Sequence, residues 1–167
     1  MGLGSNAGDS IWILSKAEEE LNERLTNCIF SRVYRSDPMY VMEQAPYLNL
    51  ACRGSWCGSP ESLLELCNQI EARYGRDRSR EQRRGARTLD IDILLFGEQQ
   101  VETETLSIPH PLLHERQFAL IPLLELFPDA RDPRDGELWS VKQGRLLPQG
   151  VYSTDIITYN DRSRGRA

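Results

Sequence analysis

The segment from Thr88 to Phe96 constrains this chain most, because it combines the composition of a buried strand with two charged side chains. Its residues are mostly β-branched or large and apolar, and Gly97 follows as a turn residue, which predicts a buried strand. Asp90 and Asp92 lie two positions apart within it. Side chains alternate between the two faces of a strand, so we expect both carboxylates on one face, roughly 6.5–7 Å apart.

Two like charges side by side in a strand are costly unless a positive group lies between them. A hard divalent cation such as Mg²⁺ meets this need, because it is held by one or two carboxylates together with substrate phosphates and water. A pair of such ions, about 3.5–4 Å apart, can clamp a phosphoryl group during its transfer. The alternative is a solvated sheet face on which the two aspartates pair with nearby arginines.

Arginines crowd the segment 73–87, against only Asp77 and Glu81. In a chain with a formal net charge of −5, this is a local positive patch suited to a polyanionic ligand. The overall acidity argues against a general nucleic-acid or membrane binder. A solvated flexible loop is the simpler interpretation of such a charge run. The lead-in Arg83-Arg84-Gly85-Ala86-Arg87 directly before the strand favours a metal–phosphate site instead, because guanidinium groups bind phosphate oxygens bidentately.

The length of 167 residues predicts one domain with a real core. The chain has no apolar run of membrane-spanning length and no signal-peptide pattern at its start, so we expect a cytoplasmic protein. The four cysteines form no C-x-x-C pair and lie far from both histidines, which argues against a zinc site and favours reduced core thiols. A disulfide stays open at this point.

Hydrophobic periodicity and turn residues divide the first part of the chain into alternating helices and strands. A first helix is expected after a turn through Asn6 and Gly8, with Asp9 or Ser10 as its cap, an apolar stripe and the acidic run 18–20 on its solvated side. The glycines before it do not have the G-x-G-x-x-G spacing of a dinucleotide-binding turn. Strands are expected over 28–35 and 47–54, and a second helix from Ser59-Pro60-Glu61 to Gly75.

The resulting order, strand, helix, strand, strand, helix, strand, predicts an α+β fold. It matches the ferredoxin-like split βαβ (βαββαβ) antiparallel sheet with helices packed on it, plus a C-terminal helix and short strands. Later in the chain, a helical run over 118–127 is expected to break at Pro122, and two prolines bracket His110. A lone histidine of this kind is more often structural than catalytic. We expect residues 1–147 to form the domain and residues 148–167 a tail or linker that is partly disordered.

The segment from Arg83 to Leu94 resembles the signature of the 6-hydroxymethyl-7,8-dihydropterin pyrophosphokinases of folate biosynthesis. The resemblance extends over about the first four-fifths of the chain. The further motifs that carry it, in chain order, are Gly4-Ser5-Asn6, Tyr34-Arg35-Ser36, Tyr47-Leu48-Asn49, Ile108-Pro109-His110-Pro111, Arg116-x-Phe118 and Pro122-Leu123. Several spaced motifs in the right order make the resemblance specific.

This resemblance implies transfer of pyrophosphate from ATP to the hydroxymethyl group of the pterin, with release of AMP. It implies that Asp90 and Asp92 hold two Mg²⁺ ions and that Arg78 and Arg87 assist catalysis. The ATP-binding residues that it implies are Asn68, Glu71, Arg78, Arg83, Arg87, His110 and Arg116. The pterin-binding residues that it implies are Asn6, Ser36, Pro38, Tyr47, Asn49 and Phe118.

The residue types agree with these roles. A flat heterocycle gains from stacking between the rings of Tyr47 and Phe118, and the Asn49 amide offers both a donor and an acceptor to a pterin edge. Plain core packing is the alternative for the two rings. The chain departs from the family pattern at Arg84, where an aromatic residue is frequent, and at Asp37, where proline is common.

Two rival functions follow from these features. The short strand ahead of Gly4, where only Met1, Gly2 and Leu3 stand, and Arg84 motivate a catalytically silent relative that still binds nucleotide. The arginine patch motivates a ferredoxin-like nucleic-acid-binding module, which predicts exposed aromatics on the central strands, although the aspartates stand where such aromatics belong. The partners expected from the first interpretation are ATP and the pterin, without nucleic acid or membrane, and a link to other folate-pathway domains or enzymes is left open.

Overall fold

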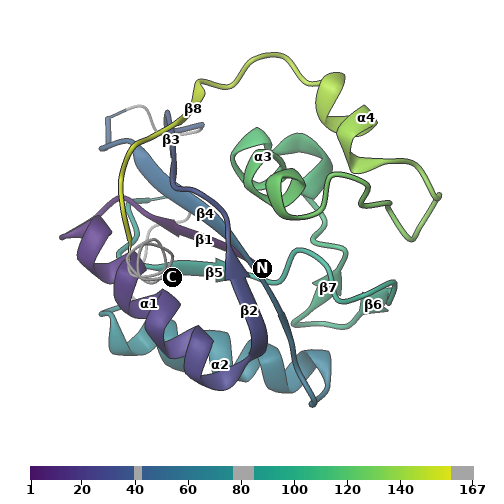
Figure 1. The fold of residues 1–167 in the computed structure, drawn as a ribbon, viewed down its shortest axis with the longest axis horizontal. Coiled ribbons are helices and arrows are strands. Elements are labelled where there is room, and N and C mark those ends of the chain that lie inside the picture. Colours follow the sequence, from purple (N-terminus) through teal and green to yellow (C-terminus); the bar gives the residue numbers. More distant parts are fainter. Residues whose placement is uncertain (40–42, 77–84, 159–167) are drawn as a thin grey trace, which may run out of the picture.

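The structure of the chain is a computed structural model, and it describes residues 1–39, 43–76 and 85–158. Figure 1 shows its helices and strands. The strands are β1 (Gly2–Ser5), β2 (Thr26–Phe30), β3 (Tyr34–Ser36), β4 (Tyr47–Ser55), β5 (Asp90–Asp92), β6 (Val101–Glu102), β7 (Ser107–Ile108) and β8 (Val151–Ser153). The helices are α1 (Ser10–Arg24), α2 (Pro60–Arg73), the 3-10 turn η1 (Leu113–Glu115), α3 (Gln117–Leu126) and α4 (Trp139–Gly144).

The main sheet is antiparallel throughout and has the strand order β5-β1-β4-β3-β8, with β2 also paired to β4. The short strands β6 and β7 form a separate hairpin. This confirms the predicted α+β class with an antiparallel sheet and packed helices. The positions of β5, β1 and β4, followed by β2 and β3, agree with the expected split βαβ order.

Helices α1 and α2 cover one face of this sheet (Figure 1). Both begin where the sequence predicts. The Asp9 carboxylate accepts a hydrogen bond from the Trp12 amide at 3.1 Å, and the Ser59 hydroxyl accepts one from the Ser62 amide at 3.3 Å, with Pro60 in the first turn. The main core lies between the two layers, and it joins apolar side chains of both helices to those of the strands: Leu3, Leu14, Leu21, Leu50, Ile70 and Ile91.

Two predicted strands differ in extent from the observed ones. The strand expected over 28–35 is divided into β2 and β3, because Ser31 bonds the Ala51 amide through its side chain at 2.9 Å, between the two ladders. The strand expected over 88–96 is limited to β5. Its pairing with β1 ends at Gly2 and Asp92, and the Leu94 carbonyl then accepts a hydrogen bond from the amide of residue 110 at 3.0 Å.

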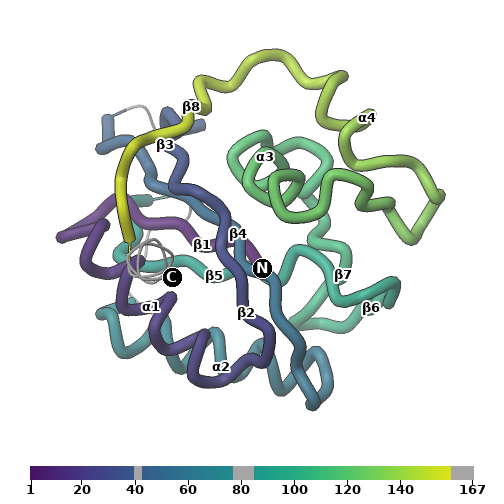
Figure 2. Tube along the Cα trace, viewed as in Figure 1, coloured from purple at the N-terminus to yellow at the C-terminus, as the bar shows by residue number. Residues whose placement is uncertain are grey.

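Helix α3 packs on the opposite face of the sheet from α1 and α2 (Figure 2). It continues through Pro122, contrary to the predicted break. Leu120 and Leu123 are buried in a second core with Leu94 and Trp139, and this packing offsets the backbone hydrogen bond that the proline removes, a cost of about 3 kcal/mol.

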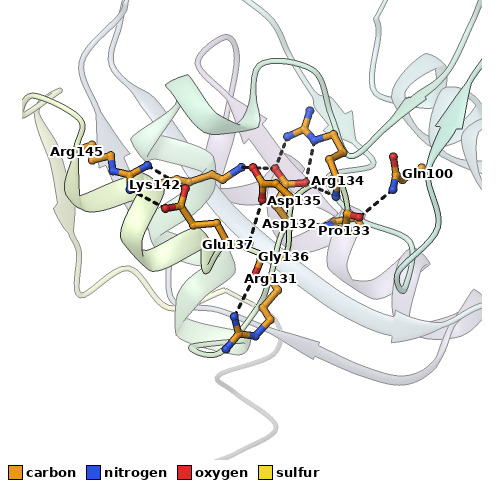
Figure 3. Close-up of polar contacts among 10 residues, drawn as sticks. All are labelled: Gln100, Arg131, Asp132, Pro133, Arg134, Asp135, Gly136, Glu137, Lys142 and Arg145. Atoms are coloured by element: carbon orange, nitrogen blue, oxygen red, sulfur yellow. Dashed lines mark hydrogen bonds and ion pairs between the residues drawn. The ribbon is translucent and has the colours of Figure 1, made fainter.

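A polar network holds the segment after α3 against α4, as Figure 3 shows. The Asp132 side chain is fully buried and accepts hydrogen bonds from Arg134 Nε at 2.8 Å and from Lys142 Nζ at 2.6 Å. Burial by itself raises the pKa of a carboxyl, but these hydrogen bonds outweigh it and hold the pKa of Asp132 well below its usual range. Arg134 and Lys142 also lie over the ring of buried Trp139, so one aspartate organises this part of the fold.

The segment predicted as a tail is described up to residue 158, and this part is joined to the rest of the molecule. Strand β8 pairs with β3. Farther on, the Thr158 hydroxyl donates a 2.7 Å hydrogen bond to Glu18 on α1. Glu18 is fully buried, so its expected place on the solvated side of α1 is wrong. The domain boundary after residue 147 stays a prediction. Within the described residues, no helix is long and apolar enough to cross a membrane.

Candidate active site

A cleft of about 110 Å³ lies on the sheet face that α3 partly covers. Strand β1 forms its floor, β5 one wall and the ends of β3 and β4 the other, while the start of α3 faces the sheet across the opening. The residues that line it include Ser36, Asp37, Met39, Gln44, Tyr47, Asn49, Arg87, Asp90, Asp92, Leu94, Arg116 and Phe118. Most of the residues that the resemblance singled out thus come together in one place.

No side chain stands on the floor of the cleft at two alternate positions of β1, because both are glycine. Gly4 lies across from Asp90 on one side and from Asn49 on the other, and Gly2 lies across from Asp92. A Cβ atom on Gly4 would lie 3.3 Å from Asn49 Oδ1. Sequence reasoning missed this function of the two glycines, although glycine inside a strand is a known sign of close approach by another group.

Asp90 and Asp92 share one face of β5, as alternation predicts, but their surroundings differ. Asp90 Oδ1 lies 2.6 Å from Arg76 Nη1, and Asp90 Oδ2 pairs with Arg87. The cations near Asp92 are farther away, with Arg116 Nη1 at 3.6 Å from Asp92 Oδ2. Direct ion pairs therefore neutralise Asp90, whereas the charge of Asp92 is only partly compensated.

Burial, followed by the negative charge of Asp90, raises the pKa of Asp92 to about 6, and Arg116 and Arg87 offset part of this effect. The surroundings of Asp92 therefore disfavour a negative charge on it beside the charge of Asp90. A hard divalent cation fits this donor set, since carboxylate oxygens are its preferred ligands. Among the described residues, no group of three His, Cys, Asp or Glu side chains is arranged to hold a metal, so further ligands would have to come from substrate phosphates and water.

His110 lies beside Asp92 in a defined orientation. Its Nδ1 accepts a hydrogen bond from the Leu112 amide at 3.2 Å, and its Nε2 lies 3.7 Å from Asp92 Oδ2. Burial and the nearby Arg116 lower the pKa of His110 to about 4. The ring is therefore neutral at pH 7, and because Nδ1 is an acceptor, its proton is on Nε2, the nitrogen that lies towards the Asp92 carboxylate.

Arg116 contributes a further donor at the start of α3. Its guanidinium lies 5.6 Å from the centre of the Phe118 ring. Its Nε is buried and has no hydrogen-bond partner among the residues that the structure describes. A buried donor of this kind is costly unless a ligand or water meets it, which suits an anion bound in the cleft.

Glu71 and Arg76 support β5 from the end of α2. Glu71 is 1 % exposed and accepts a hydrogen bond from the Ile91 amide at 2.7 Å, and it also pairs with Arg76, which in turn bonds Asp90. Arg76 was not singled out from the sequence, where it stands as one member of the arginine run. The structure thus places Glu71 where it holds the strand between the two aspartates.

The other residues expected to bind ATP lie elsewhere in the chain. Asn68 lies on α2, partly exposed. Arg78 and Arg83 lie outside the described residues. The ATP contacts of all these residues stay predictions.

The opposite wall carries the residues expected to bind the pterin. Asn49 is buried, and its Nδ2 donates a 2.9 Å hydrogen bond to Ser36 Oγ. The Tyr47 hydroxyl donates to the Gly85 carbonyl at 3.0 Å. Phe118 reaches the cleft from α3. A polar amide therefore lies in a recess that also has two aromatic rings in its lining.

Asn6 and Pro38 shape the rim of this wall. Asn6 Oδ1 accepts a hydrogen bond from the Arg87 amide at 2.8 Å, and its Nδ2 donates to the Ala45 carbonyl at 3.0 Å. Asn6 therefore joins two loops at the edge of the cleft. Pro38 is buried, and its neighbours Asp37 and Met39 line the cleft.

The chain is similar in sequence to known proteins over most of its length. Residues 1–128 match the family described as 7,8-dihydro-6-hydroxymethylpterin-pyrophosphokinase (HPPK). The chain is 43% identical over 128 residues to the 2-amino-4-hydroxy-6-hydroxymethyldihydropteridine pyrophosphokinase of Bacillus subtilis, covering 75% of each chain. It is 40% identical over 153 residues to the protein of the same name from Methylorubrum extorquens, covering 90% of this chain and 94% of that one.

A third relative is a much longer protein. The chain is 35% identical over 133 residues to the folic acid synthesis protein FOL1 of Dictyostelium discoideum, covering 80% of this chain and 20% of that protein. The family match, over residues 1–128, includes the strands and helices that build the cleft, from β1 to α3. The chain therefore belongs to the 7,8-dihydro-6-hydroxymethylpterin-pyrophosphokinase family.

Proposed function

We propose that the cleft on β1 is the site at which this chain transfers pyrophosphate from ATP to 6-hydroxymethyl-7,8-dihydropterin, releasing AMP. One observation carries this assignment. The acidic pair of β5 and the Asn49 recess of β4 lie on the same sheet face, separated only by the glycine floor of β1. Such an arrangement brings a nucleotide polyphosphate and a flat heterocycle together for direct transfer.

The Asn49 side of the cleft is suited to the pterin. The Asn49 amide is oriented by its hydrogen bond to Ser36, and an amide supplies both a donor and an acceptor to the edge of a heterocycle. Tyr47 and Phe118 supply aromatic faces for the ring. The absence of a side chain at Gly4 leaves room beside the amide, as the 3.3 Å approach of a hypothetical Cβ to Asn49 Oδ1 indicates.

The β5 side is suited to the triphosphate. Asp90 and Asp92 would hold Mg²⁺, which, when bound, neutralises phosphate charge and orients the polyphosphate. The expected number of two ions stays a prediction. Arg87 and Arg116 line the same part of the cleft, and their guanidinium groups are matched to phosphate oxygens. Beside Asp92, His110 holds its Nε2 proton as a neutral donor.

Positioning and charge neutralisation account for most of the catalysis of phosphoryl transfer. The hydroxymethyl oxygen of the pterin attacks the β-phosphorus of ATP, forms the new P–O bond and gives up its hydroxyl proton to water. The bond from that phosphorus to the bridging α,β-oxygen breaks, and AMP leaves with the electron pair. The chain therefore needs no nucleophile of its own, and we assign no residue as a general base.

The test incubates the full chain with ATP, MgCl₂ and the hydroxymethyl dihydropterin and separates AMP from ADP by ion-exchange chromatography. We expect AMP that requires both the pterin and the metal. Asp92→Asn should lower turnover by about 10²-fold or more, the several kcal/mol expected of metal-based charge stabilisation. Asp155→Asn, at an exposed position, is the matched control. ADP as the product, AMP without pterin, or normal turnover in Asp92→Asn would contradict the assignment.

Two broader expectations accompany this function. The long relative FOL1 contains the matched unit in about a fifth of its length, which supports a link between this activity and other enzymes of folate synthesis. For this chain, that link and the cytoplasmic location stay predictions.

A further inference from the structure

The chain beyond the family match returns to the cleft. Figure 1 shows the yellow segment that follows α4 passing to the edge strand β3, where it forms β8, and then continuing towards α1. We call residues 149–153 the strap. The family match ends at residue 128, so these residues lie outside it. The strap contacts the start of α3, which faces the sheet across the cleft, and β3, which belongs to one wall of the cleft.

The first end of the strap is fastened to the start of α3. Gln149 Oε1 accepts a hydrogen bond from the Gln117 amide at 2.9 Å, and Gln117 Oε1 accepts one from the Gln149 amide at 3.1 Å. Gln149 Nε2 also donates to the Glu115 carbonyl at 2.8 Å. Gln117 is the first residue of α3 and 7 % exposed, so its amide has no partner within the helix and depends on Gln149.

This contact bears directly on the cleft, because Gln117 lies between two residues that line it. Arg116 and Phe118 are its chain neighbours, and both belong to the lining. Loss of the Gln149 side chain would leave a buried amide without its acceptor, a situation that proteins relieve by local movement or water entry. The residues that would move first are the two on either side.

The second end of the strap is fastened to the wall formed by β3 and β4. The Gly150 carbonyl accepts a hydrogen bond from the Asp37 amide at 3.2 Å, and Val151 pairs with Ser36 in the β3–β8 ladder. Ser36 and Asp37 both line the cleft. Gly150 has φ +63°, and a Cβ there would collide with the Asp37 carboxylate, so this junction requires glycine.

We propose that the strap is a positioning element that sets the distance between α3 and the β3–β4 wall of the pterin recess, with Gln149 as the residue that joins them. The inference rests on the proposed function, since it assigns this recess to the pterin. The aspartates are held independently of the strap, by β1 and by the Glu71–Arg76 pair. The strap therefore acts mainly on pterin binding, and on the nucleotide side it reaches only Arg116 through its neighbour Gln117.

The test is Gln149→Ala in the full chain, with steady-state kinetics for both substrates. We expect the KM for the pterin to rise about tenfold, the factor that corresponds to loss of roughly one net hydrogen bond. The KM for ATP should rise less than the KM for the pterin, because Arg116 is the one nucleotide-side residue next to the contact, and the kcat per folded molecule should stay within about twofold. A merely structural role would lower the folded fraction, and with it the apparent kcat, without changing the KM for the pterin. Leu147→Ala, at an 83 % exposed position two residues earlier, is the matched control.

A conservative variant and a double-mutant cycle sharpen the test. Gln149→Glu keeps an acceptor for the Gln117 amide but loses the donor to the Glu115 carbonyl, so we expect an intermediate rise of about threefold. It also replaces Gln149→Ala in the assay if circular dichroism shows that the alanine variant does not fold. Gln117→Ala and Gln149→Ala should be non-additive in the KM for the pterin, because they remove parts of one reciprocal contact.

Fluorescence titration of the pterin separates this inference from the proposed function. The parent protein's pterin-dependent AMP tests the proposed function, whereas the ratio of variant to parent dissociation constants tests the strap even without turnover. An unchanged pterin KM and dissociation constant in folded Gln149→Ala, or additive effects in the cycle, would overturn the positioning role. A parent protein that binds no pterin would overturn both proposals.

Discussion

Glu71 offers the most direct test of how the acidic strand is supported, because its effect is measurable without substrate. Its side chain is 1 % exposed, accepts the Ile91 amide at 2.7 Å and pairs with Arg76. The Arg76 side chain is 8 % exposed and also lies 2.6 Å from Asp90. Glu71→Ala therefore leaves one buried amide without its acceptor and removes one carboxylate partner of a buried guanidinium, which keeps its contact with Asp90.

The magnitude follows from these two losses. An unsatisfied buried donor costs about 1–3 kcal/mol. Complete loss of the partner of a buried charge costs about 3–5 kcal/mol, and Asp90 reduces this cost because it still contacts Arg76. We therefore expect Glu71→Ala to lower the free energy of unfolding by about 3–4 kcal/mol, equivalent to a fall of about 10 °C in Tm for a chain of this size. Glu71→Gln keeps an acceptor for Ile91 and should cost about half as much.

The assay is urea and thermal unfolding of the ligand-free protein, followed by circular dichroism. Glu65→Ala is the matched control, since Glu65 is exposed on the same helix, and it should change the free energy of unfolding by less than about 0.5 kcal/mol. If Glu71→Ala unfolds within about 1 kcal/mol of the parent protein, the estimate is refuted. The Glu71–Arg76–Asp90 connection then does not support β5.

Three further predictions concern the cleft and the second core. Because burial and Asp90 raise the pKa of Asp92 to about 6, its contribution to stability is complete below about pH 4 and is lost as pH rises through 6. Asp92→Asn should accordingly raise the Tm of the ligand-free protein at pH 7.5, with the two Tm curves converging near pH 4; a lower Tm at pH 7.5 would contradict this. Gly4→Ala should weaken pterin binding by about tenfold or more in a titration, because its Cβ crowds Asn49; unchanged binding would argue against the glycine floor. Asp132→Ala should lower the free energy of unfolding by about 3 kcal/mol, because Arg134 and Lys142 lose their buried partner and Lys142 is left with the exposed Asp135, with the KM for the pterin within about twofold of the parent value; a changed KM would show coupling between the second core and the cleft.

Local sequence signals predicted the elements that depend on neighbouring residues. The caps at Asp9 and Ser59, the apolar stripes of α1 and α2 and the shared face of the two aspartates are all present in the structure. Each follows from a period or a hydrogen bond that extends over a few residues. The element order and the strand pairing of an α+β antiparallel sheet followed from the same signals.

Local signals failed where contacts with distant parts of the chain decide the structure. Pro122 predicted a break, yet the second core keeps α3 continuous. Glu18 was expected in solvent and is instead buried against Thr158, which is 140 positions away. Segment 88–96 has the composition of a long strand, but after Asp92 its backbone bonds residue 110 rather than β1.

The sequence by itself determined which chemical groups this protein has for its function. The Asp90–Asp92 pair, the neighbouring arginines and the order of the motifs depend only on residue types and their spacing. Only the tertiary structure decided how those groups are held in place. The glycine floor, the Glu71–Arg76 pair behind β5 and the strap from Gln149 all join residues far apart in the chain. Their importance comes from burial and from hydrogen bonds that form only once the sheet has brought these segments together, and no local period encodes that encounter.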